Sequence, residues 1–181
     1  MYSISLAIKQ AREVSLVSKI LLAFGMAGLT GILAQVKLFL PWTPVPVTCQ
    51  TFAVLMAGVV LGKYWGGISQ IIYVSLFAGF GAIMGPTGGY LLGFILAASF
   101  VGYVTDKFEW SKGFYQMLGI MIFANFILIY IPGLLQLSIW LHLFKGESSN
   151  IAQLLYAGVI PFIAGDLVKI VSAALIARAL K

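Results

Sequence analysis

Long apolar stretches, separated by glycine, proline and charged residues, recur along the whole chain. A helix needs about 20 mostly apolar residues to cross the hydrocarbon core of a membrane, and several of these stretches approach that length. The glycine, proline and charge breaks divide them into six predicted spans, at 20–40, 49–62, 66–82, 88–104, 114–131 and 158–178. The pattern predicts an all-α membrane protein whose six transmembrane helices form one bundle.

Two segments lie outside these spans. Residues 1–18 are largely polar but carry apolar residues on one helical stripe, which predicts an interfacial amphipathic helix. Residues 132–158 are too long for a turn and too apolar for a free linker, so we expect short helices packed over the outer face. Neither segment has the size of a separate domain, and we interpret residues 1–181 as a single transmembrane domain.

Composition supports a membrane location, since 61% of the residues are hydrophobic and 9% are charged, against about 25% charged in soluble domains. The net charge of +6 comes from basic residues scattered at segment ends, without the stripe or patch that nucleic-acid binding needs. With the N-terminus inside, most Lys and Arg residues are cytoplasmic, and Lys37 and Lys145 face out. This bias predicts that both termini are cytoplasmic.

The last predicted span contains two charged residues, Asp166 and Lys169. A charge at the centre of a membrane helix costs about 2.5–3.5 kcal/mol, and the spacing of three places both side chains on one helix face. One interpretation is a self-neutralising pair that tolerates burial. In the other, Lys169 binds a ligand carboxylate, while Asp166 keeps the lysine charged or accepts ligand N–H groups. Because apolar residues usually serve stability at least as well as a buried ion pair, the pair favours a binding site.

Other polar residues fall near the predicted outer ends of the spans. The stretch GPTGGY, residues 85–90, lets a backbone approach a ligand closely, or forms a tight turn before a close-packed helix. The amide of Gln50 can both donate and accept hydrogen bonds. Asn125 is either an interhelical hydrogen-bonding residue or a ligand contact. Thr48 suits the N-cap of the second span.

A ridge of small residues, Ala23, Ala27 and Gly31, follows one face of the first span. Such ridges allow close helix approach, either inside the bundle or against a partner membrane protein. The single cysteine, Cys49, excludes an internal disulfide and any two-cysteine metal or redox motif.

Enzyme and ATPase classes are disfavoured by the residues present. Gly62 and Lys63 are followed by Tyr64, so they do not form a phosphate-binding loop, and no nucleophile with a nearby base and no cluster of metal ligands is visible. We therefore expect neither catalysis nor a cofactor or metal. A stand-alone transporter that uses Asp166 as a proton-coupling carboxylate remains an alternative, although the inverted repeats typical of that class are not found.

Four segments, in chain order, together resemble the BioY family, the biotin-binding S components of energy-coupling-factor transporters. They read PVPVTCQTFAVLMAGVVLGKYWG (44–66), GPTGGYLLGFILAA (85–98), IYIPG (129–133) and GVIPFIAGDLVKIVSAAL (158–175). The resemblance implies a six-helix S-component fold in the cell membrane, with cytoplasmic termini and a biotin cavity that opens outward. It also implies transport powered by a transmembrane coupling subunit and a pair of ATP-binding cassette subunits.

The resemblance further implies roles for individual residues. The family's GD-x-x-K motif places the two charged residues of the last span in the vitamin site. Its GPTGGY motif contributes a loop to that site, and its threonine-x-glutamine motif contributes a side-chain amide. These residues are Asp166, Lys169, Thr87, Gly88, Gly89, Tyr90 and Gln50. Ala23 and Ala27 lie where S components dock with the coupling subunit. The outer segment ahead of GPTGG is shorter here than is usual in BioY sequences, which we expect to weaken binding or widen substrate choice.

Overall fold

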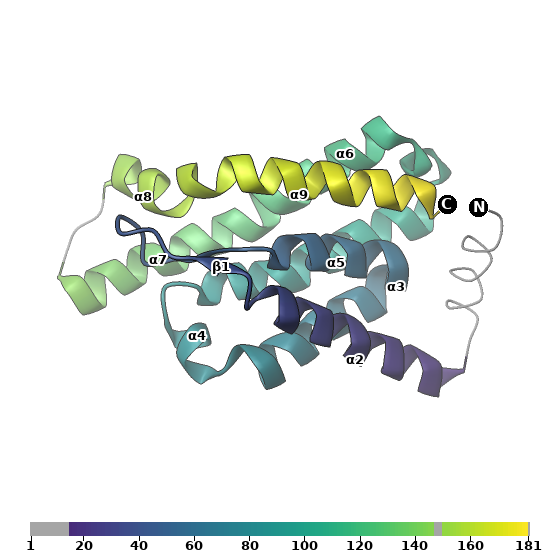
Figure 1. Ribbon diagram of the computed structural model, residues 1–181, viewed down its shortest axis with the longest axis horizontal. Coiled ribbons are helices and arrows are strands. Elements are labelled where there is room, and N and C mark those ends of the chain that lie inside the picture. The colour runs from purple at the N-terminus through teal and green to yellow at the C-terminus, as the bar shows by residue number, and fades with distance from the viewer. Residues whose placement is uncertain (1–14, 147–149, 181) are drawn as a thin grey trace.

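Helices make up almost all of the regular structure in the computed structural model, which describes residues 15–146 and 150–180. They run roughly along one axis, with the start of α2 and the end of α9 at the same end of the molecule (Figure 1). We call this end the terminal end, and the opposite end, which carries the β1–β2 hairpin, α4 and α8, the hairpin end. In chain order, the elements are α2 (Leu16–Leu33), β1 (Lys37–Leu38), β2 (Val47–Thr48), α3 (Gln50–Ile72), η1 (Tyr73–Ala78), α4 (Phe80–Met84), α5 (Gly88–Lys107), η2 (Glu109–Lys112), α6 (Phe114–Phe123), η3 (Ala124–Ile129), α7 (Tyr130–Lys145), α8 (Ile151–Gly158) and α9 (Ile160–Ala179). Of these, η1 and η3 are π-helices and η2 is a 3₁₀-helix.

Five helical runs in the described part of the chain are long and apolar enough to cross a membrane. This confirms the prediction of an all-α, multi-pass membrane protein. The count of six crossings and the cytoplasmic side of both termini stay predictions. The predicted amphipathic segment, 1–18, lies mostly outside the described residues, and its last residues start α2, where the Ser15 hydroxyl caps the helix by accepting the Ser18 N–H. The runs are 16–33, 50–78, 88–107, 114–144 and 160–179.

The run from 50 to 78 breaks at Gly62, where the sequence predicts the end of one span and the approach to the next. Gly62 has φ 77° and ψ −172°, a backbone conformation that glycine adopts without steric cost. The chain turns there, and the two halves of α3 lie against each other (Figure 1). Their contact is so close that a methyl group on Gly66 would lie 3.0 Å from the Gly58 Cα. The side chain of Asp106 accepts the Lys63 N–H at 2.8 Å and so holds the turn.

The predicted fifth span ends at 131, but the structure continues the helix through η3 and α7 to residue 145. Pro132 lies just after the π-helical segment η3, three residues into α7. The expected short outer helices are therefore wrong for residues 134–145, which extend the long helix. Residues 151–158 do form a short helix, α8, which begins with a capping box at Asn150, and its place on the outer face stays a prediction.

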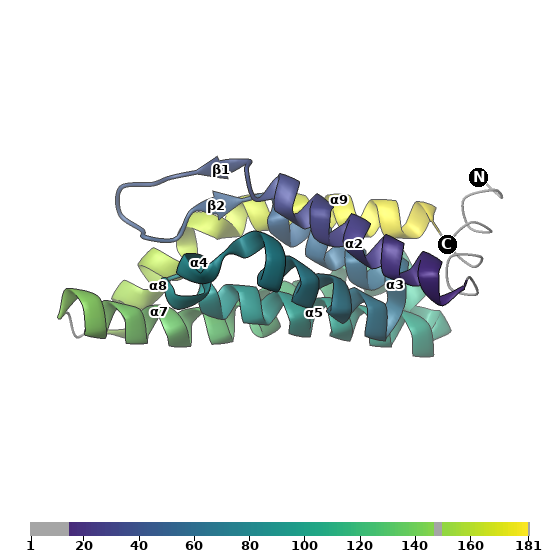
Figure 2. The same cartoon turned by 90° about the horizontal axis from the view of Figure 1, so that it is seen from below.

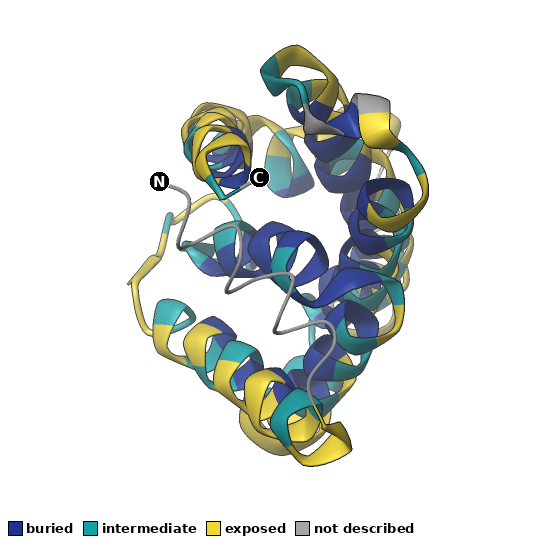
Figure 3. Cartoon of the chain, turned by 90° about the vertical axis from the view of Figure 1, so that its right-hand side faces the viewer, coloured by how far each residue is buried: buried dark blue, intermediate teal, exposed yellow. Residues whose placement is uncertain are grey.

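The interior is formed by α3 and α5, around which the other helices lie (Figures 2 and 3). Small residues let these two helices approach, because a methyl group on Gly58 would lie 2.5 Å from the Ala98 carbonyl oxygen. Large apolar side chains on the outward faces of α2 and α9, such as Ile32 and Val168, are exposed. An apolar exterior of this kind is the surface expected of a protein whose solvent is lipid.

Ala23 and Ala27 point into the bundle, where both are completely buried. On the same ridge, Gly31 faces the side chain of Phe77 in η1, because a methyl group on Gly31 would lie 3.6 Å from that side chain. The ridge thus packs α2 against the chain's own helices. Neither Ala23 nor Ala27 reaches the surface in this structure, which favours packing inside the bundle, and docking of these residues with a partner stays a prediction.

Candidate ligand-binding site

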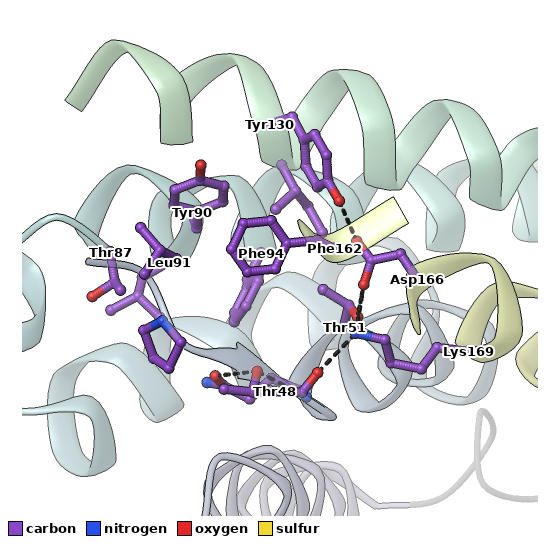
Figure 4. Close-up of a pocket in the computed structure, with 14 residues that line it drawn as sticks. Thr48, Thr51, Thr87, Tyr90, Leu91, Phe94, Tyr130, Phe162, Asp166 and Lys169 are labelled. Atoms are coloured by element: carbon purple, nitrogen blue, oxygen red, sulfur yellow. Dashed lines mark hydrogen bonds and ion pairs between the residues drawn. The ribbon is translucent and has the colours of Figure 1, made fainter. Parts of the chain in front are cut away.

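A pocket opens toward the hairpin end of the bundle, between β2 and the starts of α3, α5, α7 and α9 (Figure 4). It contains about 490 Å³ of space free of atoms, part of it in the open mouth. Most of its wall is apolar or aromatic, and the polar groups gather on the side formed by α3 and α9.

The carboxylate of Asp166 is the centre of the polar side. Its Oδ1 contacts the Lys169 Nζ at 2.5 Å and accepts the Thr51 hydroxyl at 3.3 Å. Its Oδ2 accepts the Tyr130 hydroxyl at 2.6 Å and the Asn125 side-chain amide at 2.7 Å. A carboxylate offers about four acceptor positions, so these four donors use its capacity. Asp166 is therefore held as a fully hydrogen-bonded anion in a buried position.

Lys169 lies on the same face of α9 as Asp166 and extends toward β2 (Figure 4). Besides Asp166, its ammonium donates to the backbone carbonyl of Thr48 at 2.7 Å. An ammonium has three N–H donors, and these two contacts leave one for another acceptor. The Lys169 side chain is 13% exposed, whereas that of Asp166 is 3% exposed. Of the two charges, the lysine is thus the one with both access to the pocket and spare hydrogen-bonding capacity.

Gln50 forms part of the pocket floor and is tied to two neighbours. Its oxygen accepts the Thr48 hydroxyl at 2.8 Å, and its nitrogen donates to the Tyr73 hydroxyl at 2.5 Å. Cys49 occupies the N-cap position of α3 without a side-chain cap, while the Thr48 hydroxyl, one residue earlier in β2, accepts the backbone N–H of Gln50 at 3.4 Å. Because the Thr48 carbonyl binds Lys169, the hairpin strand is also part of the site.

Four aromatic rings form the apolar wall. Tyr90 meets Tyr130 edge to face at a centroid distance of 6.2 Å and lies 6.3 Å from Phe162. The hydroxyl of Tyr90 donates to the Gly158 carbonyl at 2.8 Å, so its ring is fixed between α5 and α8. Phe94 completes the wall one turn further along α5. Such a wall suits a flat or aliphatic ligand surface.

The π-helix η3 explains how one helix brings two donors to a single carboxylate oxygen. Asn125 and Tyr130 are five residues apart, a spacing that separates side chains by about 140° around an α-helix. The i to i+5 hydrogen bonding of a π-helix makes its turn wider, and such segments are frequent at functional sites. Gly93 makes room for it, because a methyl group there would lie 2.5 Å from the Ile129 Cα.

Of the residues predicted for the site, five line the pocket: Asp166, Lys169, Tyr90, Thr87 and Gln50. Asn125 is behind the wall and contacts Asp166.

Gly88 and Gly89 do not line the pocket. A methyl group on Gly88 would lie 1.9 Å from the Ile83 carbonyl oxygen, and one on Gly89 would lie 2.0 Å from that of Pro132. Both glycines therefore serve close packing of α5, the alternative that the sequence left open.

Several lining residues carry no sequence prediction, among them Thr51, Tyr130 and Phe162. Phe162 is one turn before Asp166, so a helical projection from Asp166 would have found it, whereas Thr51 is about 100° around the helix from its neighbour Gln50 and would not have been found in this way. Tyr130 is in the quoted IYIPG segment, but its orientation depends on the π-helix, which nothing in the sequence signals.

Comparison with known proteins gives a consistent result. The model of the BioY family matches residues 7–181. A probable biotin transporter BioY of Methanothermobacter thermautotrophicus is 46% identical over 136 residues, which are 69% of this chain and 87% of that protein. The biotin transporter BioY of Thermotoga maritima is 39% identical over 153 residues, 78% of this chain and 84% of that protein.

The fold also has a solved counterpart. The crystal structure of the S component for biotin from an ECF-type ABC transporter superposes on this chain with a TM-score of 0.78. The aligned region includes 91% of this chain and 90% of the chain in that crystal structure. Its sequence identity is 23%, so this likeness concerns the fold. From the family match over nearly the whole length and the close relatives, the chain belongs to the BioY family.

Proposed function

We propose that this protein binds biotin in the pocket at the hairpin end and is the substrate-binding subunit of an energy-coupling-factor transporter in the cell membrane. The relatives are named biotin transporters, and the fold is that of a biotin S component. The observation that carries the proposal is the ion pair of Asp166 and Lys169, retained on the wall of an otherwise apolar and aromatic cavity.

The chemistry of biotin fits this cavity. Biotin has a carboxylate, a ureido ring with two N–H donors and one carbonyl acceptor, and an apolar thiophane ring and tail. The aromatic wall suits the ring and the tail, and the remaining N–H of Lys169 suits an acceptor with negative charge. Asp166 already accepts four donors, so a ligand N–H would have to displace one of them.

From this accounting we assign different tasks to the two charges. Lys169 contacts the biotin carboxylate, and Asp166 is a positioning residue that holds the lysine ammonium at the pocket wall. The ureido ring then lies against the polar floor near Gln50, whose amide has a second N–H for the ureido carbonyl.

Transport on this proposal is driven by partners. The chain binds the vitamin without chemical change and without a cofactor, while a transmembrane coupling subunit and ATP-binding cassette subunits supply the energy. Uptake measured in liposomes with and without those subunits tests this part. Biotin accumulation by the chain alone, driven by a proton gradient, would instead support the stand-alone transporter with Asp166 as proton carrier.

The binding assignment is tested by titrating the purified protein with biotin and with biotin amide. Loss of the charge-assisted bond should weaken the amide by about 1.5–3 kcal/mol, or roughly 10- to 150-fold in Kd, in the wild type. In Lys169→Met the two ligands should bind with similar, weak affinity. Lys37→Met, which changes an exposed lysine of β1, is the matched control and should keep the wild-type preference. Equal affinity of the wild type for both ligands would refute the assignment.

A further inference from the structure

A second groove lies at the terminal end of the bundle, away from the biotin pocket. It is formed where α2 begins, where α3 turns at Gly62 and where α5 ends, and it holds about 790 Å³ of open space, including its mouth. Lys19, Lys63 and Asp106 supply its charged groups. The proposed vitamin site uses none of these residues.

Cations outnumber anions in this corner of the described structure. The Lys63 ammonium lies 5.0 Å from the ring centre of Tyr64 and 5.1 Å from that of Tyr103. The Lys107 ammonium shares the Tyr103 ring at 5.3 Å and donates to its hydroxyl at 2.9 Å. Asp106 adds one carboxylate, whose Oδ2 accepts the Lys63 backbone N–H. The groove itself is lined by two ammonium groups, of Lys19 and Lys63, and by one carboxylate, and the Lys107 ammonium shares the Tyr103 ring with Lys63.

The remaining wall is apolar and aromatic. Leu22 and Leu61 line the groove beside the charges, and Trp65 and the largely exposed Tyr64 frame it. Tryptophan and tyrosine are enriched where membrane meets water, and lysines at helix ends extend to the same level. A groove lined by lysines and leucines is complementary to the two parts of a phospholipid, the charged head group and the apolar chains.

We propose that this groove binds an anionic phospholipid, with the phosphate between Lys19 and Lys63 and an acyl chain along Leu22. Charge complementarity selects the lipid class, because a basic groove between membrane helices favours anionic head groups. A choline head group would instead bring a third positive charge next to the two lysines. Free phosphate has the same charge chemistry but gains nothing from the leucines.

The test uses the purified full chain in detergent, with phosphatidylglycerol and phosphatidylcholine of identical acyl chains added in equal amounts, and counts bound lipids by native mass spectrometry. The wild type should retain phosphatidylglycerol preferentially. Lys19→Gln and Lys63→Gln should each reduce that retention about fivefold, and the double variant about 25-fold. Asp106→Asn keeps an acceptor for the Lys63 N–H while removing the repelling charge, so it should increase retention.

Lys37→Gln is the matched control, because Lys37 is a lysine at the hairpin end, outside the groove. A similar loss in this control, or equal retention of the two lipids by the wild type, would overturn the proposal. Displacement of the lipid by millimolar inorganic phosphate would make the groove a site for soluble anions. If the double variant keeps its lipid but no longer purifies with a coupling subunit, the groove is a protein interface instead.

Discussion

Replacing Lys169 by methionine should destabilise the protein more than almost any other single exchange of a polar residue. Methionine keeps the length of the side chain but leaves the Asp166 carboxylate without the ammonium at 2.5 Å. Asp166 is 2% exposed, so its carboxylate has little contact with water that could replace the lost partner. Breaking a buried ion pair from one side costs about 3–5 kcal/mol, because an uncompensated charge remains.

The double variant Asp166→Asn, Lys169→Met should recover most of this loss. The asparagine oxygen can occupy the Oδ2 position and accept from Tyr130 and Asn125, as the carboxylate does. Its NH₂ group then replaces Oδ1 and faces the Thr51 hydroxyl, which can accept as well as donate. No buried charge remains, and replacing a whole buried pair is often neutral. We expect stability within about 1–2 kcal/mol of the wild type, together with loss of biotin binding.

The free energy of unfolding can be measured in mixed micelles by titration with sodium dodecyl sulfate, followed by circular dichroism. Lys37→Met is the control and should change the free energy of unfolding by less than about 0.5 kcal/mol, as is usual for surface positions. If the Lys169→Met variant is as stable as the wild type, the pair is not a buried, mutually dependent ion pair. If the double variant is less stable than the single one, the hydrogen-bond exchange described for asparagine is wrong.

Two further exchanges test the geometry around the carboxylate by the same unfolding titration and by biotin binding. Tyr130→Phe removes a 2.6 Å hydrogen bond to Asp166 and should cost about 1.5–3 kcal/mol of stability; an unchanged value would show that the hydroxyl does not bind the anion. Gly93→Ala places a methyl group 2.5 Å from the backbone of η3 at Ile129, so it should weaken both stability and biotin binding. Gly119→Ala, with open space around its methyl group, is the matched control and should leave binding unchanged.

Much of this architecture was predictable because the length and hydropathy of a sequence stretch identify a membrane-spanning helix. The charged residues of the site were also predictable. An acid and a base three residues apart in an apolar span raise the free energy of inserting that span into the membrane, so their presence indicates a function. Gly62 marked the break between two predicted spans for a similar local reason: glycine is the residue that accepts a positive φ.

What the sequence could not reveal depends on interactions between distant segments. The wide turn of η3 has no residue signature, so the meeting of Asn125 and Tyr130 at one oxygen was out of reach. Ala23 and Ala27 show the converse difficulty. Small residues at a spacing of four indicate close helix approach, yet the pattern is the same whether the neighbour is the same chain or another one. Only the fold shows that the neighbour here is the chain itself.

The hydrogen bonds around Lys169 suggest why such a pair would be retained despite its cost. The ammonium is held by α9 through Asp166 and by β2 through the Thr48 carbonyl, and Asp166 in turn is held by α3, η3 and α7. All of these contacts are made by residues of the chain itself, so a ligand carboxylate adds a third acceptor to a lysine that the chain orients. Binding then requires little ordering of side chains, and the smaller loss of side-chain entropy makes binding tighter. An apolar replacement of the pair would preserve the fold, but it would remove the only preoriented cation that lines this pocket in the described part of the chain.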